Sequence, residues 1–71
     1  MKVTACAGEQ ADITLSLDEM IVLSNALNEV CNALEVFDFA TRIGMERAQA
    51  AALLASLGAC IDAIQSRPPE P

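Results

Sequence analysis

The fold is decided by residues 16–34, which read SLDEMIVLSNALNEVCNAL. Ser16 and Glu19 have the S-x-x-E spacing of a capping box, in which each side chain bonds the backbone N–H of the other residue. Leu15 and Met20 flank this cap at the spacing of a hydrophobic staple. Both signals predict that a helix begins at Ser16.

Apolar residues then recur at intervals of three and four, which is the spacing of one stripe along a helix. They are Met20, Leu23, Leu27, Val30 and Leu34. Asparagine and glutamate residues occupy the other side of the same stretch. An amphipathic helix is therefore predicted over residues 16–34.

A second helix is predicted over residues 45–66, which read MERAQAAALLASLGACIDAIQS. No charged residue lies between Arg47 and Asp62, so we expect this run of fourteen residues to be shielded from water on more than one side. Gly58 lies inside the run, where it costs about 1 kcal/mol relative to alanine, and this predicts a close contact or a gentle kink. The run is shorter than the roughly 20 apolar residues of a membrane span, so no membrane association is predicted.

Self-association is predicted because the chain is small and apolar. Residues of apolar type make up 54% of its 71 residues, but only 3% are aromatic, so much of this content is alanine. A domain of this size buries only about 60% of the surface of its unfolded chain. One face of the second helix carries Ala50, Leu53, Leu57, Ile61 and Ile64. A homo-oligomer, with a dimer favoured, is expected through another face, formed by Ala48, Ala52, Ala55, Ala59 and Ala63.

Residues 1–15 alternate apolar and polar side chains around Gly8, which favours a β-hairpin. A loose N-terminal arm is an equal alternative, because an isolated hairpin is marginally stable in water. Residues 67–71 form a Pro-rich tail that ends the second helix. This tail contains P-x-x-P, a pattern also found in polyproline ligands, but the helix stop is the preferred interpretation.

The corner between the helices contains both aromatic residues. Phe37 and Phe39 are expected to pack there and to fix the bend between the helices. Asp38 is a candidate cap for a short turn, and Gly44 is the candidate left-handed residue that ends it.

Together these elements predict a mainly α fold class. The expected architecture is an antiparallel pair of long helices with a short helical, Phe-containing corner and an N-terminal extended segment or hairpin. Two copies are expected to form a four-helix arrangement as a dimer. The predicted segments are an arm or small hairpin at 1–15, a helical-hairpin domain at 16–66 and the tail at 67–71.

Charge and residue types narrow the function. The formal net charge is −6, whereas nucleic-acid phosphates are bound by Lys and Arg, so no nucleic-acid binding is predicted. There is no histidine, which removes the usual general base and the commonest metal ligand. Cys6, Cys31 and Cys60 show no C-x-x-C spacing and are expected to be reduced and mostly buried, in a cytoplasmic protein. We therefore predict no enzymatic activity, no metal and no cofactor.

Two alternative functions are kept. Residues 39–54, FATRIGMERAQAAALL, have the small-residue and glycine spacing of a helix-turn-helix, which suggests a regulator or accessory subunit. Its only cations are Arg42 and Arg47, so the side chains that bind phosphates and read bases are scarce. The second alternative is a small enzyme that uses carboxylates at a dimer seam.

The far side of the first helix is the best candidate for a recognition surface. Asparagine is a mediocre helix former, so three on one face weaken the helix without adding to the core. We expect Ile21 to be an exposed apolar anchor, surrounded by amides and carboxylates; a plain solvated face is the alternative. The partner-binding candidates are Ile21, Asn25, Asn28, Glu29, Asn32 and Glu35.

The sequence thus predicts a small acidic, non-enzymatic protein-interaction module. An acidic surface suits a basic partner protein, although the same charge also serves solubility. Inhibitors and immunity-type partners of basic proteins share this size and charge, and that analogy concerns size and charge alone.

Overall fold

The computed structural model describes residues 1–67 of the chain. The elements in order are β1 (Lys2–Ala7), β2 (Gln10–Thr14), α1 (Leu17–Asn28), the π-helical turn η1 (Glu29–Ala33), α2 (Phe39–Ile43) and α3 (Arg47–Gln65). The P-x-x-P motif at 68–71 lies outside the described residues, so its prediction is not tested.

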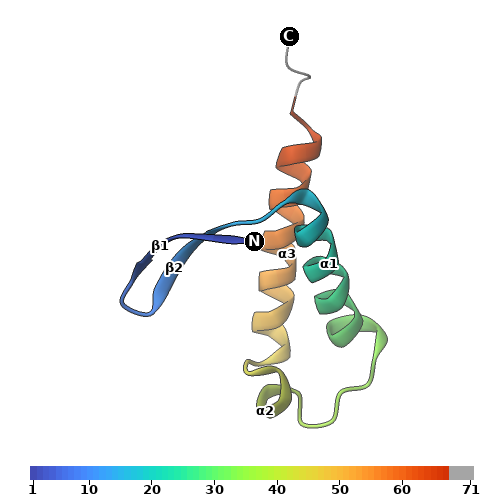
Figure 1. Ribbon diagram of the computed structural model, residues 1–71. Helices are drawn as coiled ribbons and strands as arrows, with labels where there is room; N and C mark the ends of the chain where they lie inside the picture. Colours follow the sequence, from blue (N-terminus) through green and yellow to red (C-terminus); the bar gives the residue numbers. More distant parts are fainter. Residues whose placement is uncertain (68–71) are drawn as a thin grey trace.

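The long helices α1 and α3 lie side by side and antiparallel, with α2 at the end where the chain passes from one to the other (Figure 1). The hairpin of β1 and β2 projects sideways from this pair (Figure 1). The radius of gyration is 14.3 Å, whereas a compact domain of this length has about 11 Å. The molecule is therefore extended, and the hairpin does not form a layer over the helices.

The predicted fold class, a mainly α helical pair that forms a four-helix arrangement as a dimer, is wrong. Residues 1–67 combine a two-stranded antiparallel sheet with three helices: α1 continued by η1, with 17 residues, the short α2, and α3, with 19 residues. The prediction treated the helix pair alone as the fold, whereas the hairpin stands beside the helix pair and forms part of the fold. Ile13 of β2 lines the same groove as Leu23 of α1 and Leu53 of α3. The chain is nevertheless small and mostly helical.

Residues 1–15 form the hairpin and not the loose arm. The two strands pair antiparallel along the whole of β2. Gly8 makes the turn with φ of 59°, a left-handed conformation that glycine adopts without a steric penalty. Gly8 therefore supplies the backbone conformation that the hairpin turn needs.

The first helix begins as predicted, with the capping box at Ser16. The Glu19 N–H donates to Ser16 Oγ (3.1 Å), and the Ser16 N–H donates to Glu19 Oε1 (2.9 Å). Asp18 and Glu19 also place negative charge in the first turn, where the helix dipole favours it.

The end of this helix differs from the prediction. Residues Glu29–Ala33 form a π-helical turn, which the Leu34 N–H closes by donating to the Glu29 carbonyl (2.8 Å). A π turn contains one more residue than an α turn and so shifts the positions that follow it around the helix. Cys31 is buried, whereas Leu34, the last residue of the predicted apolar stripe, follows the turn with an extended backbone and is 55% exposed.

The corner is more open than predicted. Phe37 is 85% exposed, so the expectation that both rings pack in the corner is wrong for Phe37, while Phe39 is half-buried. Asp38, between the two rings, has a left-handed backbone with φ of 53°. Its carboxylate accepts from the Thr41 hydroxyl (3.2 Å) and caps no backbone N–H. Gly44 ends α2 with φ of 97°, as predicted.

Arg47 connects η1, α2 and the beginning of α3. Its guanidinium donates to the carbonyl oxygens of Cys31 (2.5 Å) and Val30 (3.3 Å), and it lies 4.5 Å from the centroid of the Phe39 ring. These carbonyls belong to the last helical turn before the corner, where the helix dipole attracts cations. Arg47 therefore takes the role of fixing the corner that was predicted for the two Phe rings.

The core is small. Among the described residues the buried apolar side chains are Met20, Cys31 and Ala50, with exposures of 7%, 7% and 0%. The expectation that the charge-free run of α3 is shielded on more than one side is wrong for the chain by itself, because α3 meets α1 along one side. Nor does Gly58 make a close contact, since apart from its chain neighbours and the adjacent backbone of its own helix no atom lies within 4 Å of an added Cβ.

Replacing Gly58 with alanine should raise the free energy of unfolding by about 1 kcal/mol, because alanine is the better residue in a helix interior. The matched change Gly44→Ala should lower it by about 1 kcal/mol, because a side chain disfavours the left-handed backbone. Urea unfolding followed by circular dichroism measures both. A loss of stability in Gly58→Ala would contradict the open space beside this residue.

Arg47→Met should lower the free energy of unfolding by about 1–3 kcal/mol, because two helix-terminal carbonyls lose a charged donor and the Phe39 ring loses its cation. Arg42→Met is the matched control, since Arg42 lies in the last turn of the short α2. Thermal unfolding of the two variants makes the comparison. Equal stability of both would exclude a role for Arg47 at the corner.

Candidate functional site

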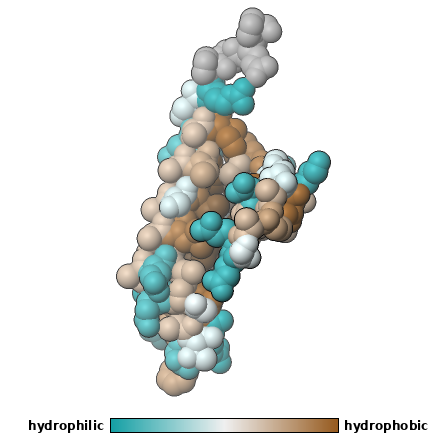
Figure 2. Space-filling view, turned by 90° about the vertical axis from the view of Figure 1, so that its left-hand side faces the viewer, coloured by the Kyte–Doolittle hydropathy of each residue, from teal (hydrophilic) through white to brown (hydrophobic). Residues whose placement is uncertain are grey.

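An apolar groove lies between the hairpin, α1 and α3. Its volume is about 500 Å³ and it is open to solvent. Figure 2 shows hydrophobic surface in the hollow beside the projecting hairpin. The described residues that line it are all apolar, and we call them the apolar groove: Ile13, Leu15, Leu23, Ala26, Leu27, Val30, Ile43, Leu53 and Leu57.

Large apolar side chains of this groove are in contact with water. Ile13, Leu23 and Leu53 are 46%, 44% and 45% exposed. Single exposed apolar residues are ordinary on protein surfaces, whereas a contiguous apolar patch marks an interaction site. These three residues come from three different elements and line one groove, so they form such a patch.

The apolar surface continues onto one face of the hairpin. Val3 pairs with Ile13, and Cys6 pairs with Ala11. Paired residues point to the same face of a sheet, as do residues two apart in one strand. A β-bulge between Val3 and Ala5 brings Val3 and Cys6 to the same face, although they are three residues apart. We call Val3, Cys6, Ala11 and Ile13 the hairpin face.

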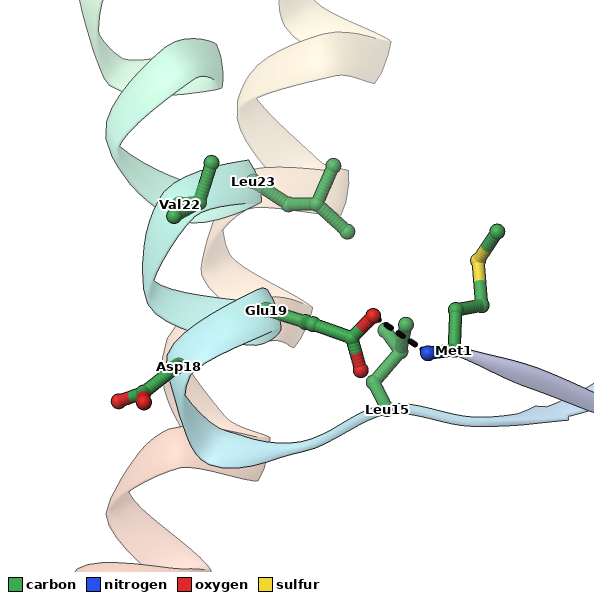
Figure 3. A pocket seen from close by; sticks show the side chains of 6 residues that line it. All are labelled: Met1, Leu15, Asp18, Glu19, Val22 and Leu23. Atoms are coloured by element: carbon green, nitrogen blue, oxygen red, sulfur yellow. Dashed lines mark hydrogen bonds and ion pairs between the residues drawn. The ribbon is translucent and has the colours of Figure 1, made fainter.

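Met1, the residue before β1, joins the hairpin to α1 (Figure 3). The Met1 ammonium forms an ion pair with the Glu19 carboxylate, whose other oxygen accepts from the Ser16 N–H. The ammonium, and after it the Ser16 N–H, lowers the pKa of the Glu19 carboxyl from 4.5 to about 2. Asp18 points away from this pair. A hollow beside the ion pair is lined by these three residues and by Leu15, Val22 and Leu23.

The predicted recognition residues of α1 and η1 lie on the outer side of these elements, and Glu35 follows in the connection to α2. The Asn32 amide donates to the Asn28 side-chain carbonyl (2.9 Å), so part of the amide row is satisfied internally. The predicted anchor, Ile21, is half-buried, whereas the adjacent Val22 is 65% exposed. With 3.6 residues per turn, the amide row lies roughly opposite the groove residues of α1. The exposed members of the set are Asn25, Asn28, Glu29, Asn32 and Glu35.

The alanines predicted for self-association lie on α3, roughly opposite the buried Ala50. An alanine side chain has little apolar area to bury, so this face offers less than the groove does. Self-association through it stays a prediction. All five are exposed: Ala48, Ala52, Ala55, Ala59 and Ala63.

Among the described residues, exposed apolar side chains are more prominent than reactive groups. Residues 1–67 contain no group of three His, Cys, Asp or Glu side chains that could hold a metal ion. The three cysteines are free, with Cys31 buried and Cys6 and Cys60 exposed. The prediction of mostly buried thiols is therefore wrong for Cys6 and Cys60, because neither the hairpin nor the outer part of α3 is covered.

By length and composition, α3 is apolar enough to cross a membrane. Core helices of soluble proteins often have the same composition, but most of such a helix is buried. In this chain only 6% of the apolar window of α3 is buried. The helix therefore has the composition of a buried helix and the exposure of a surface helix. The sequence prediction considered only the fourteen-residue run and not the whole helix.

No protein-family model, curated protein or solved structure matches the chain. The geometry of the described residues defines two surfaces on opposite sides of α1. One is the apolar groove with the hairpin face, and the other is the polar outer face of α1 and η1.

Glu19→Gln should lower the stability near neutral pH, because glutamine keeps the capping geometry but cannot pair with the ammonium. In the wild type the lowered pKa leaves Glu19 unprotonated in the folded chain at a pH where the unfolded chain takes up a proton. The contribution of the ionised Glu19 carboxylate to the free energy of unfolding is complete above about pH 4.5 and is lost as the pH falls to about 2. Urea unfolding over this range tests it. A difference between wild type and variant that does not shrink at acid pH would contradict the ion pair.

Proposed function

We propose that the chain is a small, non-enzymatic protein-interaction module. The proposal is carried by the imbalance between core and surface. The described chain buries three apolar residues, while nine large apolar side chains are at least 39% exposed, and Phe37, Met1 and Val22 are the most exposed of them. Burial of apolar area is the main favourable term in protein association. The chain therefore has more to gain from contact with another protein than its own core supplies.

The proposed partner of the outer face is a basic protein. The chain carries a formal net charge of −6, and Glu29 and Glu35 lie at the end of the amide row. Carboxylates attract Lys and Arg over long distances and raise association rates, while amides supply directional hydrogen bonds. An inhibitor or immunity-type role toward a basic protein is consistent with this surface.

The alternative functions find less support. In the segment that has helix-turn-helix spacing, Arg47 donates to the carbonyls of Val30 and Cys31, so it is engaged within the chain. Arg42 is the other cation of that segment. As for the enzyme alternative, the groove is lined by apolar side chains, whereas Glu29 and Glu35 are exposed on the far side of the helix.

Two charge-reversal variants test the outer face. Glu29→Lys with Glu35→Lys alters that face, and Glu9→Lys with Asp12→Lys alters the hairpin; both change the formal net charge from −6 to −2. Tagged proteins are used to capture and cross-link partners from native extract at low and high salt. We expect the outer-face variant to lose at least about tenfold of the captured basic partner, as a change of 1.4 kcal/mol would produce.

The hairpin variant should retain that partner. Equal loss in both variants would mean that total charge, and not the outer face, governs capture. No loss in either, or no salt dependence, would contradict a basic partner at this surface.

A further inference from the structure

The chain exposes more surface than a compact protein of its mass. Its accessible surface is 5593 Å², whereas a compact monomer of 7.5 kDa exposes about 4,200 Å². The excess is on the order of 1,000 Å². A standard protein–protein interface takes about 800 Å² from each partner, so the excess suffices for one stable interface.

This excess includes one continuous apolar surface, made of the groove and the hairpin face. Val3 of β1 is 55% exposed, and its pairing partner Ile13 belongs to both parts of the surface. Leu23 of α1 and Leu53 of α3 extend it across the helix pair. The surface has a projecting part, the hairpin, and a concave part, the groove, on the same side of the molecule (Figures 1 and 2).

We propose that a second copy of this chain docks on this surface, with the hairpin face of each copy against the apolar groove of the other. A twofold contact requires a patch that is complementary to itself. The projecting hairpin face and the concave apolar groove meet that requirement, because the hairpin face of each copy fills the groove of the other. A different protein would need to present both shapes at once.

Charge favours the same arrangement. Two copies with a net charge of −6 repel each other, and the repulsion is smallest where the contact surfaces are uncharged. The residues of the apolar groove and of the hairpin face carry no charge. The hairpin itself has only Lys2, Glu9 and Asp12, a sum of −1, while residues 16–71 carry −5. Docking through this side therefore keeps most of the acidic residues apart.

A lipid bilayer is a poorer occupant of the surface, although α3 has the composition of a membrane span. In hydrocarbon every backbone polar group needs a partner, so an open sheet edge is excluded there. The two-stranded hairpin has two such edges and stands beside α3. The amide row of α1 would also enter the lipid. A second protein surface, in contrast, leaves the outer edges and the amide row in water.

The proposal goes beyond the proposed function, because it concerns the opposite side of α1 and is tested on the purified chain alone. Sedimentation velocity and light scattering give the mass of four proteins over about two decades of concentration. They are the wild type, Leu53→Glu in the groove, Val3→Lys on the hairpin face, and Ala55→Glu on the alanine face. Leu53→Glu and Ala55→Glu place the same charge on the same helix, so they are matched.

We expect the wild type and Ala55→Glu to have twice the mass of the chain. Leu53→Glu and Val3→Lys should weaken the dimer at least about tenfold, because an unpaired charge would be buried in the contact. Circular dichroism checks that each variant keeps its helices. If Leu53→Glu does not fold, Val3→Lys decides alone, since Val3 lies on a strand and is already more than half exposed.

A monomeric wild type at all concentrations would overturn the proposal. So would a dimer that Ala55→Glu disrupts while Val3→Lys does not, because the alanine face would then be the contact. Flotation of the wild type with vesicles of phosphatidylcholine and phosphatidylglycerol, with no dimer in solution, would identify lipid as the occupant instead.

Discussion

The packing of α1 against α3 is the contact on which the other elements depend. Ala50, near the beginning of α3, has no exposed surface. Met20 and Cys31, the other two buried apolar residues, come from the α1 and η1 side of the pair. The remaining elements are attached at the ends: Arg47 fixes the corner, and the ion pair of Glu19 with Met1 holds the hairpin. Because this contact is narrow, it leaves most of both helices uncovered.

The composition of α3 explains why this narrow contact leaves apolar surface exposed. A helix that is apolar on every side is normally buried on every side, but α3 has α1 along one side only. Leu53 and Leu57 turn toward the groove, and the alanines turn the other way. The polar residues of the helical part are concentrated on the outer side of α1 instead. The described residues thus separate an apolar side of the molecule from an acidic and amide-rich side.

Local features of this fold follow from the sequence, and the contacts between distant residues do not. The capping box at Ser16 and Glu19 and the left-handed stop at Gly44 each depend on a few neighbouring residues, so spacing alone predicts them. The hairpin and the loose arm remained equal alternatives because the sequence does not show what holds the strands. Arg47 fixes the corner in place of Phe37, since its guanidinium reaches carbonyls sixteen and seventeen residues away.

The candidate surfaces were predictable to different degrees for the same reason. Asn25, Asn28 and Asn32 lie on one face by helical spacing, and the structure keeps them exposed. The groove was not foreseen, because it needs Ile13, Leu23 and Leu53 from three elements whose arrangement the sequence does not fix. The π turn at Glu29–Ala33 was missed as well. Its only signal would have been a break in the spacing, and the apolar stripe continues through Leu34 without one.

The bulge in β1 lets the hairpin lose one residue without a change of register. Between Val3 and Ala5 the strand holds one residue more than its neighbour, and every side chain nearer the turn is inverted with respect to an unbulged strand. Loss of Thr4 would remove the bulge and leave Ala5, Cys6 and Ala7 paired with Asp12, Ala11 and Gln10, so Cys6 would stay on the face of Val3 and Ile13. A single-codon deletion at this position in descendants of the gene would therefore straighten the strand and keep both the tip and the helical scaffold.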